Sequence, residues 1–138
     1  LIHPRSSNAT LQKKGSARVD ELFESASQIV VAAVTKMEAF SALRRLHAEK
    51  NLSDTEYVSL KNEIHFDFHF FSVLPLTQGI ETLVLRLIEK HQLKTLDSIQ
   101  LASCVYQNEI IQTFVVADKM LSKSAKYEGL SVMNPTEL

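Results

Sequence analysis

Short apolar runs alternate with longer stretches of helical periodicity along this chain, and the alternation restricts its fold. Residues 29–34 and 113–117 are continuous apolar runs rich in β-branched side chains, which is typical of buried strands. Weaker strand patterns occupy 72–76 and 130–133. Apolar residues at helical spacing occupy 15–26, 35–49, 53–71, 77–91, 95–108 and 119–128. We predict one α/β domain with a central, mostly parallel sheet flanked by helices that form right-handed crossovers.

Length and composition are consistent with a single folded domain. The 138 residues suit one core, which we place at 15–138, after a polar segment at 1–14 that is expected to be loop or poorly ordered. No apolar run reaches the roughly 18 residues that span a bilayer, and no signal peptide is visible. The single cysteine, Cys104, is compatible with a reducing compartment, so we expect a cytoplasmic protein. Because the formal net charge is −1, any nucleic-acid surface must be local.

Several local signals sharpen the element assignments. Ser53 and Glu56 match a capping box at the start of a helix, and Gly129 suits a left-handed helix end. Pro75 places the strand at 72–76 near a sheet edge, because proline lacks the N–H that a central strand needs. The helix at 95–108 is apolar on most sides, which predicts that it is buried.

Three acidic residues stand at or just past the predicted start of a helix: Glu38, Asp97 and Asp118. Glu38 and Asp118 each follow a predicted core strand, and Asp97 belongs to the helix expected to pack between them. Parallel strands end along one edge of the sheet, where ligands bind. Carboxylates gathered there repel one another unless a cation neutralises them. The arrangement therefore predicts a divalent metal site.

Each of these carboxylates also has a purely structural explanation. Glu38 lies three residues after Thr35 and could complete a capping box. Asp97 lies in a first turn, where negative charge favours the helix dipole, and Asp118 could be an N-cap. For each residue alone both explanations stay open, whereas their joint placement favours a site. Asp97 should be partly buried, because its helix is so apolar, and a buried carboxylate needs a partner.

Other side chains could support such a site. Thr35 and Ser98 could orient a carboxylate or a metal-bound water, or could simply be helix-start hydroxyls. Arg44 and Arg45 lie on the Glu38 helix and could contact RNA phosphates or an acidic partner, although a solvated face explains them too. Three lysines could add a basic rim: Lys94, Lys119 and Lys123.

Phe66 and Phe70 form a second apolar stripe beside the core stripe of Phe68 and Phe71. Packing explains such a stripe, and so does a subunit or partner interface.

Three blocks surround the acidic residues: TKMEAFSAL at 35–43, LKTLDSIQLA at 93–102 and FVVADKML at 114–121, with GLSVMNP closing the fold at 129–135. Their order and spacing resemble those of the PIN-domain family, and most of all the VapC-type toxins of bacterial toxin–antitoxin pairs. The resemblance covers roughly residues 15–135.

This resemblance implies a Mg²⁺- or Mn²⁺-dependent endoribonuclease that hydrolyses RNA phosphodiester bonds. Carried over by position, Glu38, Asp97 and Asp118 take the catalytic and metal-binding roles. It also implies an RNA substrate, a cognate antitoxin protein as partner, and a homodimer. The chemistry agrees, because Mg²⁺ is a hard ion that accepts carboxylate oxygens.

The sequence departs from the family at its first motif. PIN domains normally open with a strand that ends in an aspartate, but here the first acidic residue is Asp20, on a predicted helix. We expect that strand and its aspartate upstream of Leu1. Natural loss is the alternative, and it would leave a non-catalytic PIN-like interaction module with a degenerate acidic site.

Overall fold

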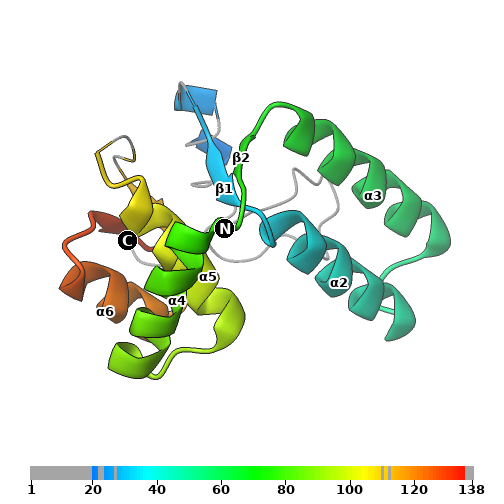
Figure 1. Ribbon diagram of the computed structural model, residues 1–138. Coiled ribbons are helices and arrows are strands. Elements are labelled where there is room, and N and C mark those ends of the chain that lie inside the picture. The colour runs from blue at the N-terminus through cyan, green and yellow to red at the C-terminus, as the bar shows by residue number, and fades with distance from the viewer. Residues whose placement is uncertain (1–19, 22–23, 27, 110, 112, 136–138) are drawn as a thin grey trace.

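The structure is a computed structural model that describes residues 20–21, 24–26, 28–109, 111 and 113–135. Its elements, in chain order, are β1 (Val30–Ala32), α2 (Thr35–Ala48), α3 (Asp54–His69), β2 (Ser72–Leu74), α4 (Gln78–His91), α5 (Thr95–Tyr106), β3 (Phe114–Val115), α6 (Lys119–Tyr127) and β4 (Val132–Met133). Figure 1 shows α2 and α3 as a hairpin on one side, α4, α5 and α6 on the other, and β1 with β2 between them. The predicted segment at 1–14 and most of the predicted helix at 15–26 fall outside the described residues.

The strands are parallel, as predicted, but they form two separate pairs. β1 pairs with β2, with Val30 opposite Ser72, and β3 pairs with β4, with Phe114 opposite Val132. Within the described residues no strand joins β1 to β3. Hydrogen-bonded strands lie about 4.8 Å apart, and each described strand has one such neighbour. In place of the predicted central sheet, the described strands thus form two small parallel sheets.

The strands are also shorter than their apolar runs. β1 ends at Ala32 because residues 33–34 already form the turn into α2. β2 ends at Leu74, directly before Pro75, and pairs only with β1 among the described strands, which fits the edge position predicted for it.

Two apolar clusters form the core, and β1 contributes to both. Val31 packs into the cluster between α2 and α3, together with Leu43, Leu60 and Ile64. The next residue, Ala32, packs into the larger cluster built on α4, α5 and α6. Successive side chains of a strand point to opposite faces, so one short strand connects the two clusters.

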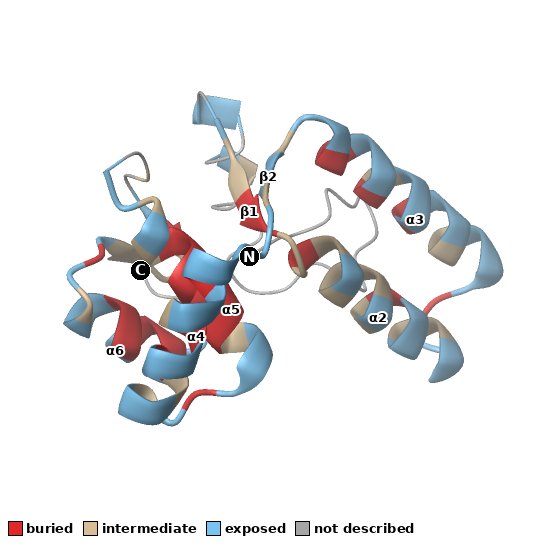
Figure 2. Cartoon of the chain, in the orientation of Figure 1, coloured by how far each residue is buried: buried red, intermediate tan, exposed pale blue. Residues whose placement is uncertain are grey.

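Helix α5 is the most buried element, as its composition predicted. Every residue from Ser98 to Cys104 is buried, and Leu101 and Ala102 have no exposed surface. Figure 2 shows the buried residues gathered along α5 and α6 and on the side of α3 that faces α2. Because α5 packs against both α4 and β1, it fixes the residues of its own first turn relative to the sheet edge.

Backbone capping follows the local signals. Ser53 accepts a hydrogen bond from the Glu56 amide at 3.1 Å, and Glu56 accepts one from the Ser53 amide at 3.0 Å, so the predicted capping box is confirmed. Gly129 has φ of 87°, the left-handed conformation expected after α6.

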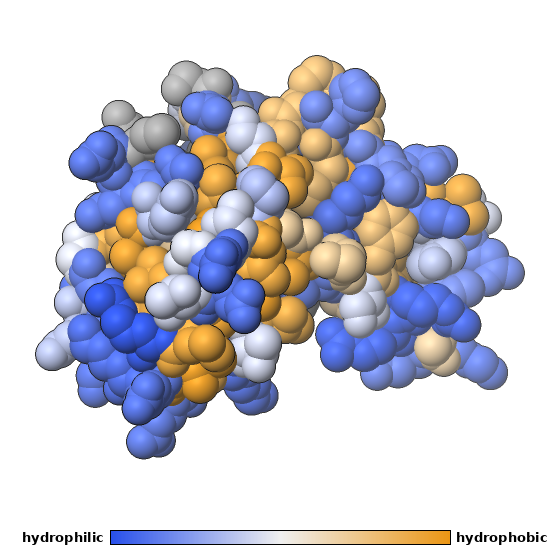
Figure 3. Space-filling view, viewed as in Figure 1, coloured by the Kyte–Doolittle hydropathy of each residue, from blue (hydrophilic) through white to orange (hydrophobic). Residues whose placement is uncertain are grey.

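The surface is uneven in polarity. Figure 3 shows apolar residues in the middle of this face, whereas the far ends of α2 and α3 are mostly hydrophilic. Phe66 and Phe70 are exposed by 63% and 68% and contact each other edge to face, with ring centroids 5.1 Å apart. Their stripe therefore lies outside the core. No helix in the described part of the chain is long and apolar enough to cross a membrane.

Candidate functional site

Glu38 is tied to α5 by its carboxylate. It lies in the first turn of α2, and its Oε1 accepts a hydrogen bond of 2.6 Å from the Gln100 amide group. Gln100 is itself buried, at 8% exposed, one helical turn beyond Asp97. The bond therefore brings Glu38 to the same face of α5 as Asp97. Gln100 was missed in the sequence, where its spacing of three from Asp97 was the available signal.

The capping-box explanation of Glu38 is wrong. Helix α2 has Val34 as its N-cap, and no side chain caps it. Thr35 is the first helical residue, 3% exposed, and its Oγ1 has no hydrogen-bond partner among the described residues. Glu38 is thus available for a role in the site, and Thr35 brings a buried hydroxyl to the same turn.

Asp97 and Asp118 influence each other electrostatically across α5 and the start of α6. Burial raises the pKa of the Asp97 carboxyl above its ordinary value, the negative charge of Asp118 raises it further, and Lys94 partly opposes both. Asp97 is half-buried, as predicted. Asp118 is exposed, so only one of the two repelling carboxylates is partly desolvated. A cation beside them would relieve the repulsion.

Asp118 is the N-cap of α6, as its structural explanation predicted. Its Oδ1 accepts a 2.8 Å hydrogen bond from the Leu121 amide. Carboxylates have about four acceptor positions, so this bond uses only part of the capacity of the group. Capping also orients Asp118, because it fixes the side chain against the first turn of the helix.

The other candidates lie at different depths. Ser98 is fully buried, and its hydroxyl donates to the Lys94 carbonyl oxygen at 2.9 Å, a bond within α5. Arg44 and Arg45 are exposed on α2, where the Arg44 guanidinium lies 3.5 Å from the His47 ring. In the structure Ser98 thus supports the first turn of α5, and the two arginines face solvent.

A comparison with known protein families matches residues 7–127 to the PIN domain. The chain belongs to the PIN domain family. PIN domains are in general nucleases that bind RNA, and they typically use a divalent metal. No curated protein matches the chain.

We call the region of Glu38, Asp97 and Asp118 the acidic edge. Its oxygen donors fit such a metal in part. In the described part of this PIN domain, no three His, Cys, Asp or Glu side chains lie close enough together to hold an ion. Mg²⁺, however, is usually bound by one or two carboxylates, waters and substrate phosphates rather than by a closed protein cage. Asp97 and Asp118 fit that open kind of site, and Glu38 contacts the same helix through Gln100.

Proposed function

We propose that this PIN domain is a metal-dependent endoribonuclease of the VapC toxin type, which hydrolyses RNA phosphodiester bonds. The observation that carries the proposal is that Glu38 is hydrogen-bonded to the helix that bears Asp97, where burial and then the charge of Asp118 raise the pKa of the Asp97 carboxyl. The hydrogen bonds of Glu38 and Asp118 do not relieve the repulsion between Asp97 and Asp118, whereas a bound cation would relieve it.

Glu38, Asp97 and Asp118 would hold Mg²⁺ or Mn²⁺ in this proposal. When bound, the ion offsets charge on the phosphate and lowers the pKa of a water that attacks phosphorus. Gln100 would position the Glu38 carboxylate, and the Leu121 amide would position that of Asp118. Hydrolysis forms one bond from a water oxygen to phosphorus and breaks one P–O ester bond, and a water proton passes to the leaving oxygen. No side chain needs to form a covalent bond with the substrate.

The same proposal includes partners. A VapC-type toxin would act in the cytoplasm, would be held inactive by a cognate antitoxin protein and would form a homodimer. The exposed pair Phe66 and Phe70 supports an interface on α3, because large exposed aromatic side chains are enriched at protein contacts.

Calorimetry with Mg²⁺ and Mn²⁺ tests the metal site. We expect binding by the unaltered protein and its loss in Asp97→Asn, which removes one charged ligand with little change in shape. Glu89→Gln is the matched control, since Glu89 is an exposed residue of α4. RNA cleavage should disappear with metal binding in Asp97→Asn and persist in the control.

A non-catalytic PIN-like interaction module is the second candidate. It is favoured by the finding that the described residues contain no three-residue metal cluster. Absence of Mg²⁺ and Mn²⁺ binding by the unaltered protein, with its circular dichroism intact, would select this candidate and reject the nuclease.

A further inference from the structure

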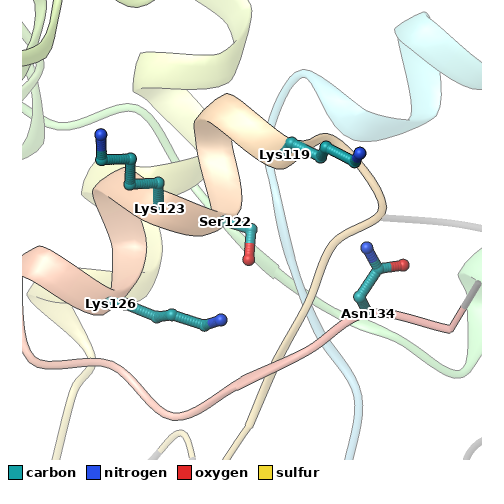
Figure 4. Close-up of a pocket in the computed structure, with 5 residues that line it drawn as sticks. All are labelled: Lys119, Ser122, Lys123, Lys126 and Asn134. Carbon is teal, nitrogen blue, oxygen red and sulfur yellow. The ribbon is translucent and has the colours of Figure 1, made fainter. Parts of the chain in front are cut away.

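A pocket of about 250 Å³ lies beside α6, and none of Glu38, Asp97 and Asp118 lines it. Its lining residues are Lys119, Ser122, Lys123, Lys126 and Asn134. Figure 4 shows the side chains of Ser122 and Lys126 reaching toward the segment that carries Asn134, with Lys119 at the other end of the same opening. The lining is therefore made of cationic and neutral hydrogen-bonding groups, with no acidic member.

The charge of this pocket contrasts with that of the chain. Helix α6 has three lysines and no acidic residue, whereas the whole protein has a formal net charge of −1. The ion pairs of the described residues use other cations, on α2 and α4, so none of the α6 lysines is neutralised by a carboxylate within 4.0 Å there. Unneutralised lysines beside hydroxyl and amide groups suit an anion with several acceptor oxygens.

The frame around the pocket is well fixed. Ser122 is 7% exposed, and the Asn134 amide group donates to the Ala117 carbonyl oxygen at 3.3 Å, which ties the end of β4 to the end of β3. Ala117 directly precedes Asp118, the N-cap of α6. With a rise of 1.5 Å per residue, Lys126 lies about 12 Å along the helix from Asp118. The basic pocket and the acidic edge thus share one rigid helix.

We propose that this pocket binds a backbone phosphate of the RNA substrate at a nucleotide away from the scissile bond. The inference rests on the proposed nuclease function, and it adds a second contact that holds the strand across α6. A single strand of RNA carries a phosphate at every nucleotide, so a strand at the acidic edge can also reach lysines further along the helix. Such contacts fix position and contribute affinity without reading sequence.

Binding of fluorescently labelled single-stranded RNA, measured by anisotropy in EDTA, tests the pocket without any need for metal or cleavage. The variant is Lys119→Gln with Lys126→Gln, and the charge-matched control is Lys50→Gln with Lys61→Gln, two exposed lysines at the α2–α3 hairpin. We expect the pocket variant to bind more weakly, equally so for RNAs of different sequence. Its slope of log K against log salt should be less steep by about 0.7, the value for one lost phosphate contact on a single strand.

Three results would overturn the proposal: no RNA binding by the unaltered protein, an equal loss in the control variant, or an unchanged salt slope in the pocket variant. A polyglutamate peptide that binds more tightly than RNA at equal charge concentration, and loses that advantage in the pocket variant, would be a fourth such result, because it would identify an acidic protein segment as the occupant. Thermal unfolding of both variants checks that they fold. If the lysine effect holds while the unaltered protein never cleaves RNA, the nuclease proposal fails and the phosphate site stands.

Discussion

Among single residues, Asp97 shows that the proposed metal site reduces the stability of the metal-free protein. Asp97 is half-buried in the first turn of α5, directly before the buried residues 98–104 and near the charge of Asp118, and both conditions disfavour its ionised form. The Glu38 carboxylate, by contrast, accepts a hydrogen bond from the Gln100 amide group. A site that binds a cation is expected to retain repulsion of this kind when the cation is absent.

The pH dependence of Asp97→Asn measures the combined effect of burial and of the Asp118 charge on Asp97. Because the pKa of Asp97 is raised in the folded protein, the folded state binds more protons than the unfolded one as pH passes above the ordinary value of 3.8. Ionisation of Asp97 therefore lowers the free energy of unfolding as pH rises. We expect metal-free Asp97→Asn to resist urea better than the unaltered protein at pH 7, with the difference vanishing near pH 3. Equal midpoints at pH 7 would show that Asp97 is not under strain from its surroundings.

At the scale of elements, a charged cluster holds the end of α6 to α4. The Glu128 side chain, 7% exposed, accepts hydrogen bonds from Lys90 at 2.8 Å and Arg86 at 3.4 Å, and lies 2.8 Å from the His91 ring. Burial alone would raise the pKa of Glu128, but the hydrogen bonds with Lys90 and His91, and their charge, outweigh it and lower the pKa. The contact joins residues that are far apart in the sequence, so only the folded chain has it.

Replacing this carboxylate should loosen α6. We expect Glu128→Gln to reduce the free energy of unfolding at pH 7 by about 2 kcal/mol, as is usual for a hydrogen-bonded charge that loses its partners. Since the pKa of Glu128 is lowered on folding, its contribution is present above the ordinary pKa and disappears as pH falls through the lowered value. Urea unfolding at pH 7 and pH 3 measures both. Glu89→Gln makes the same chemical change at an exposed position and should leave the urea midpoint unaltered at either pH.

At the scale of the whole molecule, β1 connects two apolar clusters that would otherwise be separate. Val31 belongs to the cluster of α2 and α3, and Ala32 to that of α4, α5 and α6. Glu38 and Gln100 add a polar link between the same two halves. The acidic edge lies where the halves meet, so its geometry depends on both clusters.

We therefore expect the two clusters to unfold together. Ile64→Ala and Leu101→Ala remove fully buried side chains, one from each cluster, and each should cost about 2–5 kcal/mol. In either variant a single calorimetric transition should move to lower temperature as a whole. Two resolved transitions, of which Ile64→Ala moves only one, would show that β1 does not couple the halves. Val58→Ala, an exposed apolar change on α3, is the control and should shift the transition little.

In the described part of the chain, local sequence patterns were enough to predict the order and type of the elements and most of the helix ends. Helical and strand periodicities extend over several consecutive residues, so they can be recognised in the sequence. Helix caps such as Ser53 with Glu56, or Gly129, involve residues that are close in the chain, so local sequence also predicts them. The same locality explains the correct expectation that α5 is buried. It also placed Glu38, Asp97 and Asp118 at helix starts, although it could not say which of them were caps.

The remaining features depend on how distant parts of the chain pack together. The tertiary structure showed that Asp118 is a cap, that Glu38 is not, and that Gln100 reaches across 62 residues to hold Glu38. It divided the strands into two pairs, and it gathered Lys119, Lys126 and Asn134 around one pocket. Each of these depends on the distance between side chains that are remote in sequence, and packing of whole elements, rather than any local preference, sets that distance.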